Sequence, residues 1–91
     1  MPRYMVERSL PGFDVSQLPG AAASAKTATL QMTGEGTPIR YLRSTFVPAE
    51  EKCFCLFEGT SEVAVEEANA RAGIPFERIH EAEHIASEDL A

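Results

Sequence analysis

The sequence predicts an α+β fold of the ferredoxin-like type, a βαββαβ sandwich in which two helices cover one face of a four-stranded antiparallel sheet. Two observations predict this fold. Segments with strand and helix patterns follow one another in the order strand, helix, strand, strand, helix, and the segment left at the C-terminus can supply the fourth strand. The length of 91 residues suits one domain, so we expect 1–91 to be a single ferredoxin-like domain.

The first two elements are separated by turn signals. Tyr4–Leu10 alternates apolar and charged residues and is closed by a Pro-Gly pair, which is typical of a short strand followed by a turn. Apolar and small residues then recur at helical spacing from near Pro19, where proline suits the first turn of a helix. The Gly-Glu-Gly segment at 34–36 provides the stop. Alanines on the buried face let this helix approach the sheet closely.

The next three elements form a hairpin and a second helix. Ile39–Val47 and Lys52–Glu58 are rich in aromatic and β-branched residues and lie four residues apart, which predicts two paired strands. Thr60 or Ser61 can cap the second helix, and Gly73 can end it.

The last segment, Phe76–Ile85, contains a literal H-E-x-x-H motif at 80–84. In a helix the i, i+4 spacing would place His80 and His84 on one zinc ion. In a strand they would lie about 13 Å apart, too far to share an ion. We expect a strand, because Pro75 blocks a continuing helix and the sheet needs a fourth strand. His80 and His84 are then candidate metal ligands only as separate residues.

Composition and charge exclude several classes of protein. The chain is 44% hydrophobic and 24% charged, as in ordinary globular domains, and it has no apolar run of the roughly 20 residues that a membrane span requires. Fourteen acidic against eight basic residues give a net charge of −6, which opposes nucleic acid and anionic lipid as partners. The charged N-terminus shows no signal peptide, so we expect a cytoplasmic location.

The two cysteines, Cys53 and Cys55, are expected to be reduced, because two thiols at i and i+2 do not make a disulfide framework. Their first interpretation is as small buried hydrophobic residues of a strand. The alternative is that the pair contributes to a soft-metal site for zinc or copper(I).

Strict alternation along the hairpin predicts two unlike sheet faces. The side of Leu42 is expected to meet the helices, which leaves Tyr41, Arg43 and Thr45 on the open face beside Cys53, Cys55 and Phe57. This open face could hold a small anionic or aromatic ligand, form a dimer interface, or do both if the cleft lies between subunits. The predicted cleft comprises Glu7, Tyr41, Arg43, Thr45, Cys55 and Phe57.

Three blocks carry a family resemblance: MPRYMVER at 1–8, FCLFE at 54–58 and AGIPFERI at 72–79. In this order they resemble a family of small bacterial proteins, a domain of unknown function that includes a nickel-binding protein. The resemblance implies a ferredoxin-like fold, a final strand, a dimer of the α/β-barrel type and no generally assigned enzymatic activity. Nickel is therefore a candidate cofactor. Family members often carry a histidine where this chain has Arg43, and a guanidinium cannot replace imidazole as a ligand.

Two main functional hypotheses remain open. The first is a non-catalytic homodimer that binds a small molecule or a metal ion on its open sheet face. The second is a small dimeric α/β-barrel enzyme, an isomerase or a cofactor-independent oxygenase, with Glu7, Arg43, Cys55 and His80 as acid-base and anion-binding candidates. A pure interaction or regulatory module is a third possibility.

Overall fold

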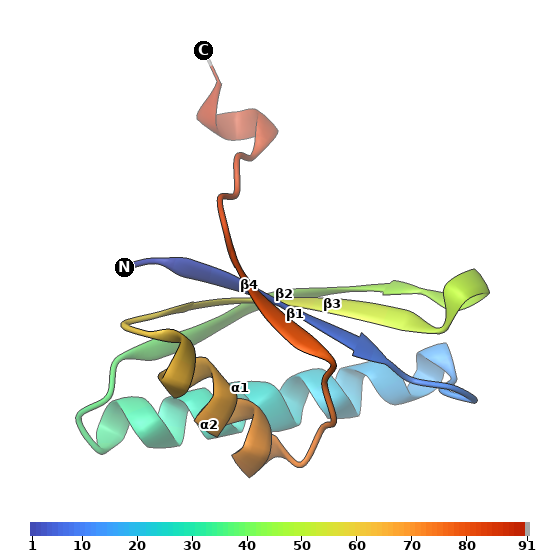
Figure 1. The fold of residues 1–91 in the computed structure, drawn as a ribbon, viewed down its shortest axis with the longest axis horizontal. Coiled ribbons are helices and arrows are strands. Elements are labelled where there is room, and N and C mark those ends of the chain that lie inside the picture. Colours follow the sequence, from blue (N-terminus) through green and yellow to red (C-terminus); the bar gives the residue numbers. More distant parts are fainter. Residues whose placement is uncertain (91) are drawn as a thin grey trace.

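The computed structural model describes residues 1–90 and has the predicted ferredoxin-like arrangement (Figure 1). Only Ala91 of the predicted domain lies outside the described residues. The sheet order is β2-β3-β1-β4, and each neighbouring pair is antiparallel. The main elements are β1 (Arg3–Ser9), α1 (Leu18–Gly34), β2 (Ile39–Val47), β3 (Lys52–Gly59), α2 (Glu62–Ala72) and β4 (Arg78–Ala82).

The helices form one layer and the sheet forms the other. Both helices cover the same sheet face, whereas the segment after β4 rises from the opposite face (Figure 1). The core between the layers combines large side chains of the strands with small residues of the helices. The small alanine side chains let the helices come close to the sheet. It includes Tyr4, Val6, Leu10, Ala25, Met32, Ile39, Cys53, Cys55, Phe57, Ala64, Val65 and Ala68.

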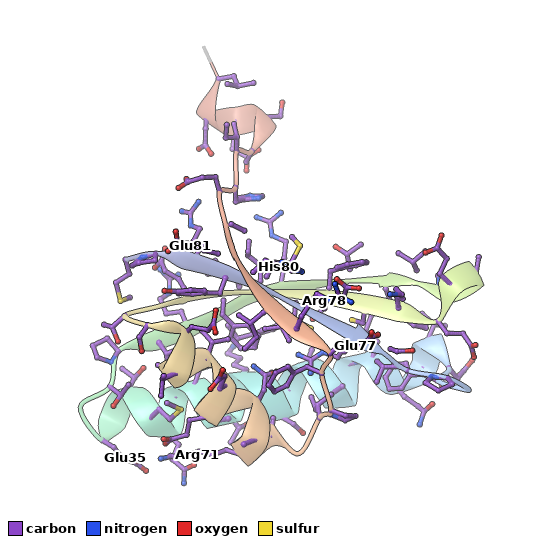
Figure 2. All side chains as sticks on the ribbon, in the orientation of Figure 1. Glu35, Arg71, Glu77, Arg78, His80 and Glu81 are labelled. Carbon is purple, nitrogen blue, oxygen red and sulfur yellow. The ribbon has the colours of Figure 1, made fainter. Side chains whose placement is uncertain are left out.

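The helix ends follow the sequence signals. Ser61 caps α2 by accepting a hydrogen bond from the Ala64 amide at 3.2 Å. Gly73 ends α2 with φ of 71°, in the left-handed region that glycine adopts at low cost. On the outer surface, Arg71 of α2 pairs with Glu35 at the end of α1 at 2.8 Å, which ties the two helices together (Figure 2).

The C-terminal element is a strand, as predicted, although it is shorter than the predicted segment. β4 pairs with β1, and His80 lies opposite Met5. His84 lies beyond the end of β4. The H-E-x-x-H match therefore has no helical backbone, and the shared zinc geometry that the motif would require is not formed.

A β-bulge in β2 changes which side chains face the helices. Tyr41 pairs with Phe57, but the next pair is Arg43 with Leu56, so Leu42 is an extra residue without a partner on β3. Before the bulge, the odd-numbered residues of β2 face the helices. After it, the even-numbered residues Ser44 and Phe46 pair with Cys55 and Cys53 on that face.

Half of the predicted cleft therefore lies on the wrong face. Cys55 and Phe57 are 6% and 0% exposed and belong to the core, and Tyr41 packs against Phe57 with ring centroids 5.6 Å apart. The expectation that the Leu42 side of β2 meets the helices is confirmed for Ser44 and Phe46, but the placement of Tyr41 on the open face is wrong, because the extra residue at Leu42 reverses the alternation before the bulge. Glu7, Arg43 and Thr45 lie on the open face, as expected.

Among residues 1–90 no helix is both long enough and apolar enough to cross a membrane.

Candidate functional site

Glu7 is the centre of a polar cluster on the open face. One carboxylate oxygen, Oε2, accepts a hydrogen bond from Lys52 Nζ at 2.9 Å. The other, Oε1, lies 3.4 Å from His80 Nε2 and 3.7 Å from Arg78 Nε. Antiparallel pairing of β4 with β1 produces this cluster, because Arg78 lies opposite Glu7 and His80 is two residues further along the same face (Figure 2).

The cluster keeps its carboxylate ionised. The hydrogen bond from Lys52 holds the pKa of Glu7 below its ordinary value, and the hydrogen bond to His80 acts in the same direction. The same ion pair raises the pKa of Lys52. Glu7 is thus an ionised carboxylate at neutral pH. One of its oxygens accepts a hydrogen bond from Lys52, and the other faces the imidazole of His80.

His84 lies in a separate contact with Arg43. The distance between Arg43 Nη2 and His84 Nε2 is 2.6 Å, and the Arg3 guanidinium donates to the His84 carbonyl at 3.1 Å. A guanidinium has only donors, so Nε2 of His84 must accept and the ring proton must lie on Nδ1. The lone pair that would bind a metal is already used by Arg43.

The open face is basic although the whole chain is acidic. Five of the eight basic residues lie on it, against the two strand carboxylates Glu7 and Glu58. The five are Arg3, Arg40, Arg43, Lys52 and Arg78. The net charge of −6 therefore describes the helix layer and the loops, and it does not describe this face.

The open face brings one imidazole, that of His80, next to one carboxylate, that of Glu7, and both groups can act as metal ligands. No group of three or more His, Cys, Asp or Glu side chains able to hold a metal ion is present in residues 1–90. His80 and Glu7 are the pair with compatible chemistry, since imidazole and carboxylate oxygen both bind borderline divalent ions.

The helix-facing side of the sheet contains a buried arginine. Arg8 is 1% exposed, and its Nη2 donates to Asn69 Oδ1 at 2.7 Å. Its Nη1 lies 3.3 and 3.4 Å from the carbonyls of Pro75 and Ile74, and its Nε has no hydrogen-bond partner among residues 1–90. Sequence reasoning missed this residue, although the alternation that buries Tyr4 and Val6 in β1 also places Arg8 on their face.

Two thiols lie beside this arginine. Arg8 is the direct cross-strand partner of Cys53, whose Sγ is 3.9 Å from that of Cys55. Cys55 Sγ lies 3.0 Å from Ser44 Oγ, which in turn lies 2.7 Å from the hydroxyl of Tyr41. Burial, together with the neighbouring thiol, raises the pKa of Cys53 to about 11, so the uncomplexed thiol is protonated.

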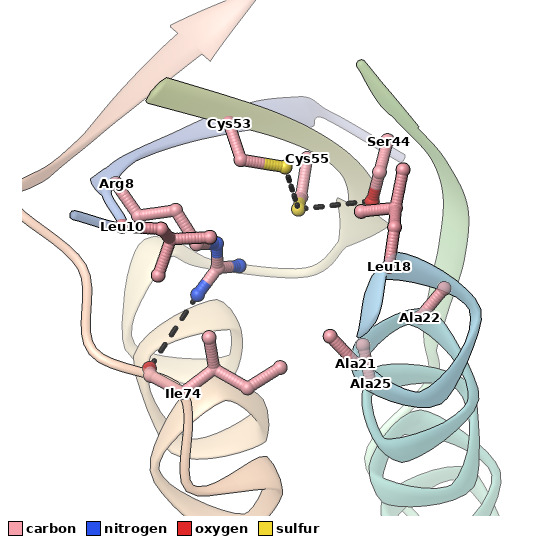
Figure 3. A pocket seen from close by; sticks show the side chains of 10 residues that line it. All are labelled: Arg8, Leu10, Leu18, Ala21, Ala22, Ala25, Ser44, Cys53, Cys55 and Ile74. Atoms are coloured by element: carbon pink, nitrogen blue, oxygen red, sulfur yellow. Dashed lines mark hydrogen bonds between the residues drawn. The ribbon is translucent and has the colours of Figure 1, made fainter. Parts of the chain in front are cut away.

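Arg8, Ser44 and the two thiols line a small, partly open cavity of about 10 Å³ under the first turns of α1 (Figure 3). Its lining is mostly apolar. The lining residues are Arg8, Leu10, Leu18, Ala21, Ala22, Ala25, Ser44, Cys53, Cys55 and Ile74.

The four candidate catalytic residues do not share one cleft. Glu7, Arg43 and His80 lie on the open face, whereas Cys55 is buried on the other side of the sheet. The sheet itself separates the thiol from the three polar groups. An acid-base constellation that includes Cys55 is therefore not formed.

Comparison with known proteins identifies the family. Residues 4–82 match the family model described as nickel responsive protein SCO4226-like. The chain is also similar to a solved structure, the crystal structure of SCO4226 from Streptomyces coelicolor A3(2), with 25% sequence identity and a TM-score of 0.73. That match covers 92% of this chain and 99% of the other. No curated protein matches the chain.

The buried arginine gives a stability prediction. Replacing Asn69 with alanine removes the shortest hydrogen bond to a guanidinium that water cannot reach, so the free energy of unfolding should fall by about 2–3 kcal/mol. The control is Gln31→Ala, which removes an exposed acceptor of Arg71 and should change stability by less than about 0.5 kcal/mol. Urea denaturation measures both. Equal effects of the two substitutions would contradict the view that Arg8 depends on Asn69.

Proposed function

This chain belongs to the nickel responsive SCO4226-like family, and on that premise we propose that it is a non-catalytic protein that binds nickel on the open face of its sheet as a homodimer. The observation that carries the proposal is the contact of His80 Nε2 with Glu7 Oε1 at 3.4 Å. When a metal ion displaces the Nε2 proton that makes this contact, the imidazole and the carboxylate become a pair of metal ligands on the exposed side of the sheet.

The donors fit a borderline divalent ion in chemistry. Imidazole nitrogen and carboxylate oxygen suit nickel(II), and the hydrogen bond from Lys52 fixes the orientation of the carboxylate, as outer-shell partners of metal ligands commonly do. Arg78 and Lys52 oppose a second cation beside Glu7. The pair alone should therefore bind nickel weakly, and a second chain or water must supply further ligands.

The surface around this pair supports a homodimer. Met5 and Phe54, both partly exposed, form a small apolar patch on the open face beside the buried Leu56, with charged residues around it. Such a surface resembles a dimer interface, which has an apolar centre and a polar rim. The segment after β4 projects from the same face and presents Ile85 and Leu90 at 73% and 68% exposure (Figure 1). A second copy would cover these side chains.

Nickel binding should depend on His80 and Glu7. The substitutions His80→Ala and Glu7→Gln should each lower nickel(II) affinity by about tenfold or more, because each removes a donor of the proposed site. Isothermal titration calorimetry with nickel chloride measures the change. His84→Ala is the matched control and should leave the affinity unchanged, because Arg43 already occupies the His84 Nε2 lone pair.

Absence of nickel binding by the unaltered protein would contradict the proposal. Binding that is lost with His84→Ala and kept with His80→Ala would also contradict the assigned ligands.

Arg43→His should create a stronger nickel site. Arg43 already contacts His84, so an imidazole at position 43 would place a second nitrogen donor near a ring nitrogen that the substitution also frees. The same change removes one positive charge from the open face. We expect a gain of about tenfold in nickel(II) affinity, measured by the same titration. Arg43→Gln removes the charge without adding an imidazole, and an equal gain there would mean that charge alone is responsible.

The projecting segment should hold the dimer together. Replacing Ile85 and Leu90 with aspartate should weaken self-association by about tenfold or more, because charged groups would have to be buried in the interface. Val63→Asp is the control, since Val63 is 69% exposed on α2, in the helix layer away from the open face. Sedimentation velocity at micromolar concentration should show twice the mass of one chain for the unaltered protein and for Val63→Asp. A monomer in every sample would contradict the homodimer.

A further inference from the structure

We propose that the buried Cys53–Cys55 pair is a second metal site, on the helix side of the sheet, that takes a monovalent soft ion, copper(I), with the Arg8 guanidinium as its countercharge. Three observations converge on it: the spacing of the sulfurs, the unbalanced charge of Arg8, and a cavity of atomic size between them. This site is independent of the nickel proposal, because the sheet separates the two sets of donors.

The sulfur spacing suits a shared ion. The two Sγ atoms are 3.9 Å apart. With metal–sulfur bonds of about 2.3 Å, two thiolates on one ion lie about 3.8 Å apart at a tetrahedral angle and about 4.6 Å apart when the ion lies on the line between them. The observed spacing falls within this range. Only small movements of two side chains on one strand would be needed.

The charge of Arg8 selects a monovalent ion. Arg8 is 1% exposed and forms no ion pair with a carboxylate in residues 1–90; its hydrogen-bond partners are all neutral. A buried charge without a countercharge is costly. Two thiolates with one copper(I) carry a net charge of −1, which balances the guanidinium of the cross-strand neighbour of Cys53. Two thiolates with a divalent ion are neutral and would leave Arg8 uncompensated.

The cavity limits the coordination number. Its volume of about 10 Å³ holds roughly one water-sized occupant. Apart from Arg8, Ser44 and the two thiols, its lining side chains are aliphatic, so no further strong ligand is present there. Zinc requires four ligands, and copper(II) prefers nitrogen and oxygen donors, whereas soft thiolates favour copper(I). The two buried thiolates therefore favour copper(I) over zinc because there are too few ligands for zinc, and over copper(II) because the ligands are sulfur. Binding releases the two thiol protons.

The test is a competition titration of the reduced protein with copper(I) under anaerobic conditions, with bicinchoninate as the chromophoric competitor. We expect one copper(I) per chain and a loss of affinity of about 100-fold in Cys53→Ser and in Cys55→Ser, since each variant keeps a single thiolate. X-ray absorption of the complex should show sulfur neighbours. His80→Ala and His84→Ala are the matched controls and should bind copper(I) like the unaltered protein.

Arg8→Met tests the charge argument separately from the ligands. It keeps a long apolar side chain in the core, and replacement of a buried charge by an apolar residue is often tolerated. We expect folding to be retained, as judged by circular dichroism, and copper(I) affinity to fall by about tenfold, because the complex loses its countercharge. Asn69→Asp, which supplies Arg8 with a competing carboxylate, should lower the affinity in the same direction.

Failure of the unaltered protein to compete with bicinchoninate would overturn the proposal. Full affinity in both cysteine variants would do so too, as would dependence on His80 or His84. Unchanged affinity in both Arg8→Met and Asn69→Asp would overturn the role of Arg8. None of these results bears on nickel binding at His80 and Glu7.

Discussion

The buried guanidinium of Arg8 connects the parts of this molecule that matter for both proposed sites. Its hydrogen bonds to Asn69 and to the carbonyls of Ile74 and Pro75 fasten the turn after α2 to β1. Two residues later the Glu77 amide donates to the carbonyl of Glu7 at 2.8 Å, and β4 begins. The register of β4 on β1, and with it the position of His80 beside Glu7, therefore follows from an interaction on the opposite side of the sheet. Burying the charge of Arg8 costs free energy, but its hydrogen bonds specify where the turn after α2 lies.

Local chemistry made the element order predictable from the sequence. Ser61 and Gly73 fix the ends of α2 by capping, and the bounds of β2 follow from its run of aromatic and branched residues. The side-chain faces were only partly predictable, because they depend on register. One extra residue at Leu42 puts Tyr41 on the core side together with Ser44 and Phe46, and nothing in the sequence of this segment indicates a bulge. The prediction that Cys53 and Cys55 are buried is confirmed, because it rests on residue type. The prediction that they lie on the open face is wrong, because it rests on which residues of the strand were assumed to face the helices.

The distribution of charge over the two layers has a physical explanation. A strand residue on the open face reaches water without crossing the helix layer, so Arg3, Arg40 and Arg78 can stay solvated beside Glu7 and Glu58. Acidic residues lie on the exposed side of α2, where Glu62 also favours the N-terminus of the helix. Two copies that met through their open faces would each bring a basic surface. Anions, or the acidic C-terminal segments with Glu83, Glu88 and Asp89, would be needed to offset the repulsion.

The sheet thus separates two kinds of ligand chemistry. On the open side, nitrogen and oxygen donors lie at a surface that water reaches, where a divalent ion can retain water and accept ligands from a second chain. On the helix side, two sulfurs line a mostly apolar cavity with a cation beside them, and this favours an anionic complex of a soft monovalent ion. The same β-strand pairing produces both, because neighbouring residues of β1 point in opposite directions: Glu7 faces His80 outside, and Arg8 faces Cys53 inside. Selectivity at each proposed site would follow from solvation and charge as much as from the identity of the ligands.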